Sequence, residues 1–157
     1  MSTSAPVDAS PVGDQLEAML RGTGLKVTQP RLAVLRALQG RPHISADAVV
    51  ALVRHELPTA SLQSTYNVLT ALAERGLVRR IEPAGHAGRY ELRVGDNHHH
   101  AVCTRCGAIT DIDCAVGHAP CLTPSGANDF SVMEAEVTFW GQCADCQNQP
   151  QQNEATS

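Results

Sequence analysis

GDNHHHAVCTRCGAITD, residues 95–111, places three consecutive histidines just before a Cys-x-x-Cys pair, Cys103 and Cys106. A second pair, Cys143 and Cys146, follows near the C-terminal end. Two such pairs can supply four thiolates to a closed tetrahedral zinc site, and the residues between them would fold as the body of a small domain clipped by the metal. The alternative, a pair of thioredoxin-like redox dithiols, fits less well, because that motif usually occurs once and near a βαβ pattern, which the sequence lacks.

The histidine triplet runs into an alternating segment, and side chains two residues apart on a strand share a face. His98 and His100 therefore point to one side and His99 to the other. Two imidazoles on one face are half of a site for a borderline divalent metal such as Fe(II), Mn(II) or Zn(II). The candidates to complete it are Asp111, Glu91 and His43. The spacing leaves open the alternative of three solvated histidines beside a zinc knuckle.

Charge divides the chain in two. Residues 1–93 carry 11 basic and 8 acidic side chains, whereas residues 94–157 carry Arg105 alone against 8 acidic ones, within a net charge of −4 over 157 residues. This asymmetry indicates two modules with different partners. All six cysteines fall in the acidic half, which in a cytoplasmic protein favours metal or redox chemistry over a disulfide framework.

The sequence predicts an α+β fold: a winged helix-turn-helix DNA-binding domain at 14–93, followed by a small α/β domain for metal binding and dimerisation at 94–147. Capping residues and glycine stops delimit helical segments at 14–24, 28–40, 45–57 and 61–76, and LVRRIEP and GRYELRV form a hairpin around PAGHAG. HHHAVC, AITDID and SVMEAEVTFWG then predict short strands. The polar segments 1–13 and 148–157 are expected to be disordered.

The last helix of a helix-turn-helix enters the major groove of double-stranded DNA, and its first residues meet the base edges. Here that helix supplies Gln63, Ser64, Thr65, Tyr66 and Asn67. The arginines expected to meet phosphates are Arg31, Arg79, Arg80 and Arg89. The alternative is an ordinary solvated helix face with Tyr66 half-buried.

Two further classes of protein are less consistent with the chain. No apolar run approaches the roughly 18 residues of a membrane span, and the N-terminal segment lacks the regions of a signal peptide, so we expect a cytoplasmic protein with no membrane partner. A zinc hydrolase using the histidines would need a motif such as H-E-x-x-H, which is absent, so we expect no enzyme. Cys114 and Cys121, in a proline-broken connector, are interpreted as small buried residues, with a peroxide-sensitive pair or an accessory metal site as alternatives.

KVTQPRLAVLRAL, LQSTYNVLTAL, RYELR, NHHHAVCTRCGAITD and WGQCADC resemble the ferric uptake regulator family in order and spacing over residues 14–146. The two extra cysteines make the chain most similar to the actinobacterial FurA-type subgroup. The resemblance implies a homodimeric, metal-dependent repressor of palindromic AT-rich operators, with a structural Zn2+ on the four paired cysteines. It also implies a regulatory Fe2+ or Mn2+ ion, with Zn2+ as the alternative, held by His43, Glu91, His98, His100 and Asp111.

The chain departs from the family at two places. Many members use a histidine shortly before the final aromatic-glycine pair for a third metal site; MEAEVTFWG has none, so that site is absent or rebuilt with His99 and His118. Glu91 stands where peroxide sensors of the family carry aspartate, which leaves iron sensing and peroxide sensing unresolved. The subgroup resemblance implies a redox-responsive regulator of a catalase-peroxidase or oxidative-stress operon and of its own gene; the alternative is a zinc- or iron-uptake regulator on the same scaffold.

Overall fold

The structure is a computed structural model that describes residues 10–83, 85–92, 98–113, 129–131 and 137–149. It divides the chain into two compact units. The first contains the described residues up to Glu82 together with residues 87–92, and the second contains the described residues between Pro83 and His86 together with those from His98 onward.

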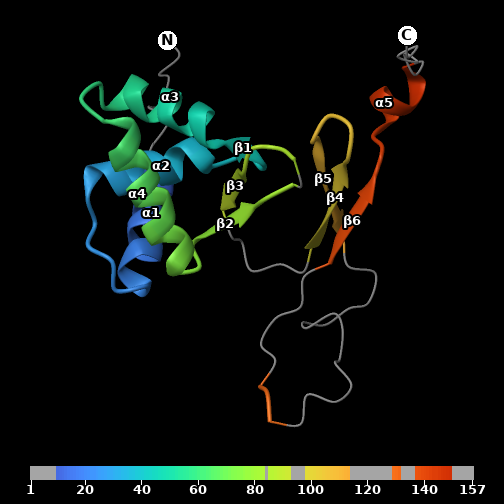
Figure 1. Ribbon diagram of the computed structural model, residues 1–157. Coiled ribbons are helices and arrows are strands. Elements are labelled where there is room, and N and C mark those ends of the chain that lie inside the picture. Colours follow the sequence, from blue (N-terminus) through green and yellow to red (C-terminus); the bar gives the residue numbers. More distant parts are fainter. Residues whose placement is uncertain (1–9, 84, 93–97, 114–128, 132–136, 150–157) are drawn as a thin grey trace, which may run out of the picture. The chain divides into compact units, whose positions relative to one another are not determined.

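Four helices make up most of the first unit: α1 (Ser10–Gly22), α2 (Gln29–Leu38), α3 (Ala46–Glu56) and α4 (Leu62–Glu74) (Figure 1). Local chemistry explains two of the starts. The Ser45 hydroxyl accepts a hydrogen bond from the backbone N–H of Ala48, and Ser61 and Ser64 form a reciprocal capping box at the start of α4. Thr28 stands at the N-cap of α2 but its side chain makes no capping hydrogen bond. Helix α1 begins ahead of residue 14, where the sequence predicts it to start.

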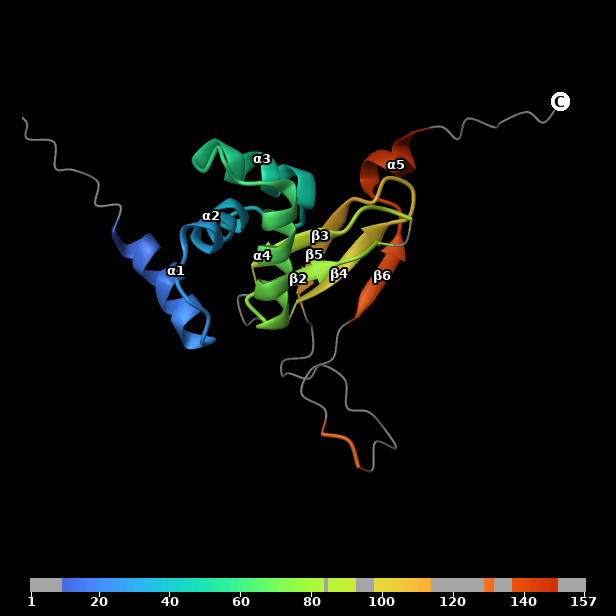
Figure 2. The same ribbon diagram turned by 60° about the vertical axis from the view of Figure 1, so that its left-hand side comes forward.

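A small antiparallel sheet completes the first unit. Its strands are β1 (Ile44–Ser45), β2 (Val78–Ile81) and β3 (Arg89–Leu92), in the order β1-β3-β2. Strands β2 and β3 are the predicted hairpin, paired from Val78 opposite Leu92 to Ile81 opposite Arg89. Helices α1 to α4 gather together beside this sheet (Figures 1 and 2). Four helices and a two-stranded wing give the winged helix-turn-helix predicted from the sequence.

Helix α2 is the centre of the hydrophobic core of the first unit. Leu35, Leu38 and three shorter apolar neighbours of α2 are almost completely buried. Leu20 of α1, Val49 of α3 and Leu69 of α4 pack into the same cluster. Because apolar burial is the main favourable term in folding, this cluster stabilises the scaffold that carries α4 and the wing.

The second unit is a three-stranded sheet followed by a short helix. Its strands are β4 (His98–Cys103), β5 (Ile109–Asp113) and β6 (Thr138–Gly141), in the order β5-β4-β6. Strand β4 pairs antiparallel with β5 and parallel with β6. Helix α5 (Ala144–Asn148), which the sequence does not predict, follows β6 (Figure 1). Residues 132–136, part of the predicted final strand, lie outside the described residues. The predicted α+β fold class is confirmed.

Candidate metal centres and DNA-binding surface

The four paired cysteines converge in the second unit. Cys103 ends β4, Cys106 lies in the turn to β5, Cys143 caps α5 and Cys146 lies within it. All four Sγ atoms lie within 4.8 Å of one another, and the Sγ atoms of Cys106 and Cys143 are 3.7 Å apart. All four are free thiols.

These sulfurs fit a tetrahedral metal. Zn–S bonds of about 2.3 Å separate the sulfurs of a tetrahedral site by roughly 3.8 Å, close to the measured Cys106–Cys143 spacing. The pKa of Cys103 is lowered to about 6, chiefly by the backbone N–H of Cys143 and then by that of Cys106. The side-chain hydrogen bond that the Cys146 thiol makes to Cys143, followed by burial, raises the pKa of Cys146 to about 12. Such opposite shifts are typical of thiols that compete for the same few donors, and a bound cation would favour the thiolate of each.

Backbone and side-chain hydrogen bonds hold the two cysteine pairs together. The N–H and hydroxyl of Thr104 both donate to the carbonyl of Gly141. The Arg105 guanidinium donates to the carbonyl of Cys146 at 3.0 Å. Sequence reasoning does not single out Arg105 for this role, although it is the lone basic residue of the acidic half; that isolation is the signal that could have found it.

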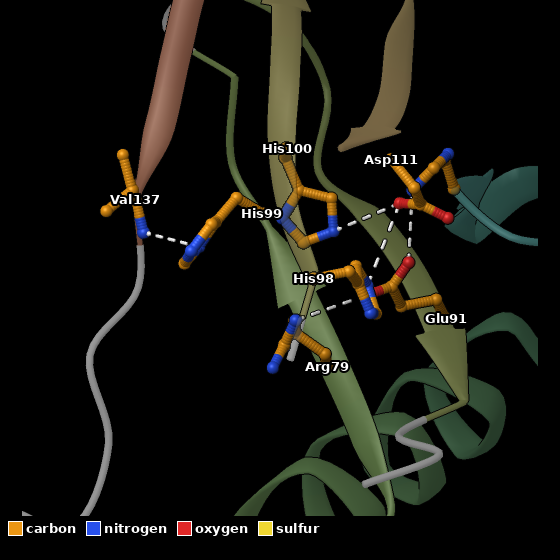
Figure 3. Close-up of polar contacts among 8 residues, drawn as sticks. Arg79, Glu91, His98, His99, His100, Asp111 and Val137 are labelled. Atoms are coloured by element: carbon orange, nitrogen blue, oxygen red, sulfur yellow. Dashed lines mark hydrogen bonds and ion pairs between the residues drawn. The ribbon is translucent and has the colours of Figure 1, made fainter. Parts of the chain in front are cut away.

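A second group of ligand atoms lies on one face of the sheet β5-β4-β6. The Nε2 atoms of His98 and His100 are 3.7 and 3.5 Å from the same oxygen, Oδ1, of Asp111 (Figure 3). The two rings meet edge to face with centroids 5.0 Å apart. The register that places His100 opposite Asp111 produces this cluster, because paired residues point to the same side of a sheet.

His99 points away from that cluster. Its ring is buried, and its Nδ1 accepts a hydrogen bond from the backbone N–H of Val137 at 3.2 Å (Figure 3). This bond gives the middle histidine a structural partner just before β6. Its suggested accessory partner, His118, lies outside the described residues, as do Cys114 and Cys121.

The remaining predicted metal ligands lie in the first unit. The Nε2 of His43 is 3.1 Å from Oε2 of Glu91, and both side chains are nearly buried. His43 has a φ of 58°, a left-handed conformation that is uncommon outside glycine and that histidine adopts more readily than most residues. It leads the chain into β1, which pairs with the strand that carries Glu91.

Helix α4 presents most of the predicted base-contacting residues. Gln63, Ser64 and Asn67 are exposed, and the Gln63 amide donates to Asn67 Oδ1 at 2.9 Å. Tyr66 is 36% exposed. The structure corrects the expectation for Thr65, which is buried and whose hydroxyl donates to the Ser61 carbonyl. Its position on the core side of the helix excludes it from contact with a base.

The predicted phosphate contacts differ in their surroundings. Arg31 donates to the Lys26 carbonyl, and Arg80 is exposed and paired with Glu82. Arg89, opposite Ile81 in the hairpin, is partly exposed. Arg79 is the exception, because its side chain is only 13% exposed and lies against Glu91. The structure therefore does not place Arg79 at the surface where a phosphate would approach.

A winged helix-turn-helix joined to a unit with four converging thiols defines a class of protein: a transcriptional regulator with a metal-binding domain. The Ferric uptake regulator family model matches residues 22–139. The chain is 55% identical over 127 residues to the transcriptional regulator FurA of Mycobacterium tuberculosis, covering 81% of this chain and 86% of that protein. It is also 55% identical over 128 residues to ferric uptake regulation protein 1 of Mycolicibacterium fortuitum, covering 82% and 80%.

The structure agrees with this likeness at the level of fold. The Helicobacter pylori ferric uptake regulator aligns with a TM-score of 0.65 over 87% of this chain and 91% of that one, at 20% identity. The chain belongs to the ferric uptake regulator family and is a transcriptional regulator, similar to the mycobacterial FurA proteins. Among the described residues, no helix is long and apolar enough to cross a membrane.

Proposed function

We propose that the protein is a metal-dependent repressor that binds double-stranded DNA as a homodimer, and that a divalent metal on histidine and carboxylate ligands favours the DNA-binding state. One observation carries the proposal: each unit gathers imidazole and carboxylate groups apart from the thiol cluster. The first holds His43 beside Glu91, and the second holds His98 and His100 beside Asp111. Nitrogen and carboxylate ligands in this ratio suit Fe(II), Mn(II) or Zn(II).

The four cysteines are assigned a different task, that of a structural zinc site. Four thiolates fill the coordination shell, so they leave no position for a substrate or a signal. Through the zinc ion, the four cysteines would fix the end of β4 to α5, because binding of a structural zinc ion is linked to folding. Only the histidine and carboxylate ligands would then respond to metal levels.

Division of the regulatory ligands between the units explains how metal could control DNA binding. His43 and Glu91 belong to the unit with α4, and the other three ligands belong to the unit with the thiols. A complete shell exists only in arrangements that bring both sets together, so metal selects those arrangements. Binding of metal and binding of DNA are then coupled, so each raises the affinity of the protein for the other. Every 1.4 kcal/mol of coupling free energy changes that affinity by about tenfold.

DNA recognition is assigned to α4 and the wing. Gln63, Ser64 and Asn67 lie exposed at the start of α4, where a recognition helix meets base edges, and Arg31, Arg80 and Arg89 would contact phosphates. Phe139 and Trp140 are exposed on β6 at the edge of the described sheet. The open edge of this strand is the surface that we assign to pairing with a second copy, and a two-fold dimer requires a palindromic operator.

The gating proposal is tested by metal-dependent DNA binding. Fluorescence anisotropy with a palindromic AT-rich duplex is measured after the thiol site has been filled with zinc, with and without Mn(II). His98→Ala and Asp111→Ala are expected to lose the metal dependence. The control is His55→Ala, which removes an exposed imidazole from the last turn of α3. Full metal-dependent binding by both site variants would refute the gating model.

The signal is proposed to be peroxide, acting on a catalase-peroxidase or oxidative-stress operon and on the regulator's own gene. The 55% identity to FurA supports this assignment. Release of DNA would follow oxidation of His43, His98 or thiols beside bound Fe(II). Mass spectrometry after peroxide treatment is expected to find added oxygen on one of these residues in the Fe(II)-loaded protein and none in the Mn(II)-loaded protein. Equal oxidation in both forms would refute iron-dependent sensing.

The second candidate is an iron- or zinc-uptake regulator. The equal identity to ferric uptake regulation protein 1 favours it, and Glu91 is compatible with it. Operator binding is compared with Fe(II), Mn(II) and Zn(II), followed by peroxide. A response to metal level that peroxide does not reverse supports the uptake regulator, whereas release by peroxide supports the redox regulator.

A further inference from the structure

Arg79 lies against a buried carboxylate rather than at the DNA-facing surface. In the hairpin Arg79 stands directly opposite Glu91, so both side chains leave the sheet on the same side. The Nη1 of Arg79 is 3.7 Å from Oε1 of Glu91, and the two side chains are only 13% and 5% exposed (Figure 3). All of these contacts lie within the first unit.

A buried carboxylate requires such a neighbour, because an isolated charge in the interior is very costly. The two oxygens of Glu91 face different side chains. Oε2 lies 3.1 Å from His43 Nε2, and Oε1 faces the guanidinium. An arginine stays protonated at every ordinary pH, so the charge beside Oε1 is permanent.

The distance between Arg79 and Glu91 shows that Arg79 compensates the charge of the carboxylate without forming a strong hydrogen bond. Charge-assisted N–H···O hydrogen bonds are about 2.7–2.9 Å long, and a contact beyond about 3.5 Å is not a hydrogen bond. At 3.7 Å, Arg79 stabilises the carboxylate electrostatically rather than through a short hydrogen bond. A divalent ion that binds this oxygen would meet a fixed positive charge next to it.

We propose that Arg79 is a built-in cation that competes with divalent metal for Glu91, and so sets the metal concentration at which the histidine and carboxylate site fills. The inference rests on the proposed function, since it requires Glu91 as a metal ligand. Arg79 neutralises Glu91 in the metal-free protein, and its charge repels the incoming ion. Arg79 therefore weakens metal binding, so the site fills only at higher metal concentrations.

The test measures Mn2+ affinity in the full-length, zinc-filled protein, from the electron paramagnetic resonance signal of free aqueous Mn2+. Mn2+ prefers nitrogen and oxygen ligands to thiolates, so it reports on this site. Arg79→Met, which keeps an apolar stem but removes the charge, is expected to bind Mn2+ about tenfold more tightly, equivalent to ~1.4 kcal/mol. The matched control, Arg80→Met, removes the same charge one residue away, where the side chain is exposed and paired with Glu82; it should stay within about twofold of wild type.

Two further measurements separate competition from a purely structural role. In the zinc-filled protein without Mn2+, Arg79→Met should lower the thermal midpoint more than Arg80→Met, because Glu91 loses its compensating charge. Arg79→Lys retains the charge and should bind Mn2+ within about threefold of wild type. Tighter Mn2+ binding together with a lower thermal midpoint without Mn2+ is expected only if Arg79 competes with the metal for Glu91.

The possible outcomes distinguish this inference from the proposed function. Equal or weaker Mn2+ binding by Arg79→Met would overturn competition, as would a tenfold gain in Arg79→Lys. If Glu91→Gln binds Mn2+ as tightly as wild type, Glu91 is not a ligand and both proposals fail. If Glu91→Gln weakens binding while Arg79→Met leaves it unchanged, only the role of Arg79 is refuted.

Discussion

Removal of zinc from the four-cysteine site should unfold the second unit and leave the first folded. The basis is the uneven distribution of buried apolar side chains. The hydrophobic cluster built around α2 consists entirely of residues of the first unit. Among the described residues of the second unit from His98 onward, the buried apolar side chains are Val102, Cys103 and Cys146, and two of these are proposed zinc ligands.

The size of the expected loss of stability follows from these few buried side chains. A fully buried aliphatic side chain contributes about 1.5–3 kcal/mol, so Val102 gives the sheet little stability of its own. A structural zinc ion contributes an apparent ~10–16 kcal/mol at neutral pH, more than the net stability of about 5–15 kcal/mol of a typical domain. Loss of zinc should therefore cost the second unit more free energy than its net free energy of unfolding.

The chain provides separate probes for the two units. Its single tryptophan is Trp140, on β6 next to the thiols and 49% exposed, whereas α1 to α4 provide most of the helical circular dichroism. After chelation, the cooperative thermal transition in Trp140 fluorescence should disappear while the helical transition remains. Cys146→Ser should behave like the chelated protein, and Cys121→Ser, a thiol loss outside the two pairs, should behave like wild type. Fluorescence and dichroism melting together at an unchanged midpoint, with zinc absent by metal analysis, would refute the reasoning.

Other predictions concern single residues. Gly76 has a φ of 72° with open space around it, so Gly76→Ala should lower the free energy of unfolding of the first unit by about 1–2 kcal/mol in urea titrations; an unchanged midpoint would contradict this backbone argument. Ser61→Ala removes the hydroxyl that caps α4 and should cost about 1 kcal/mol in the same assay; a variant as stable as wild type would contradict the capping role. Arg105→Met loses the bond to the Cys146 carbonyl and should release zinc to a chelator faster than Lys26→Met. The Cys103 pKa lies near 6, below the ordinary value of 9.0, so protons compete with zinc for this thiolate only as pH falls through about 6. The apparent zinc affinity, measured with a colorimetric indicator, should therefore fall more steeply with pH below about 6 than above it, and an unchanged slope there would contradict this.

Local chemistry made several features predictable from the sequence. Ser45 and Ser61 were identifiable as caps because a short hydroxyl side chain before an apolar helical pattern satisfies free backbone N–H groups. Gly76 was identifiable as a stop because glycine adopts a left-handed conformation without steric cost. Strand alternation separated His99 from its two neighbours, and the buried ring bonded to Val137 agrees with that separation.

Other features depend on contacts between distant segments. Thr65 belongs to the same polar run as Gln63, but the packing of α4 on the core turns it inward. Strand alternation puts Arg79 and Arg80 on opposite faces, but only pairing with β3 shows that Arg79 lies beside Glu91 and that Arg80 is exposed. Helix α5 is too short to show a helical period in the sequence.

The sequence by itself determined which chemical groups are available and which strand face each one occupies, because residue type and alternation are properties of the local chain. It therefore indicated four thiols for one site and imidazoles with carboxylates for another. The tertiary structure decided which of these groups meet: the parallel pairing of β4 with β6 that precedes the thiol cluster, and the register that sets Arg79 against Glu91. Strand register is set by long-range packing and turn geometry, which no local pattern contains.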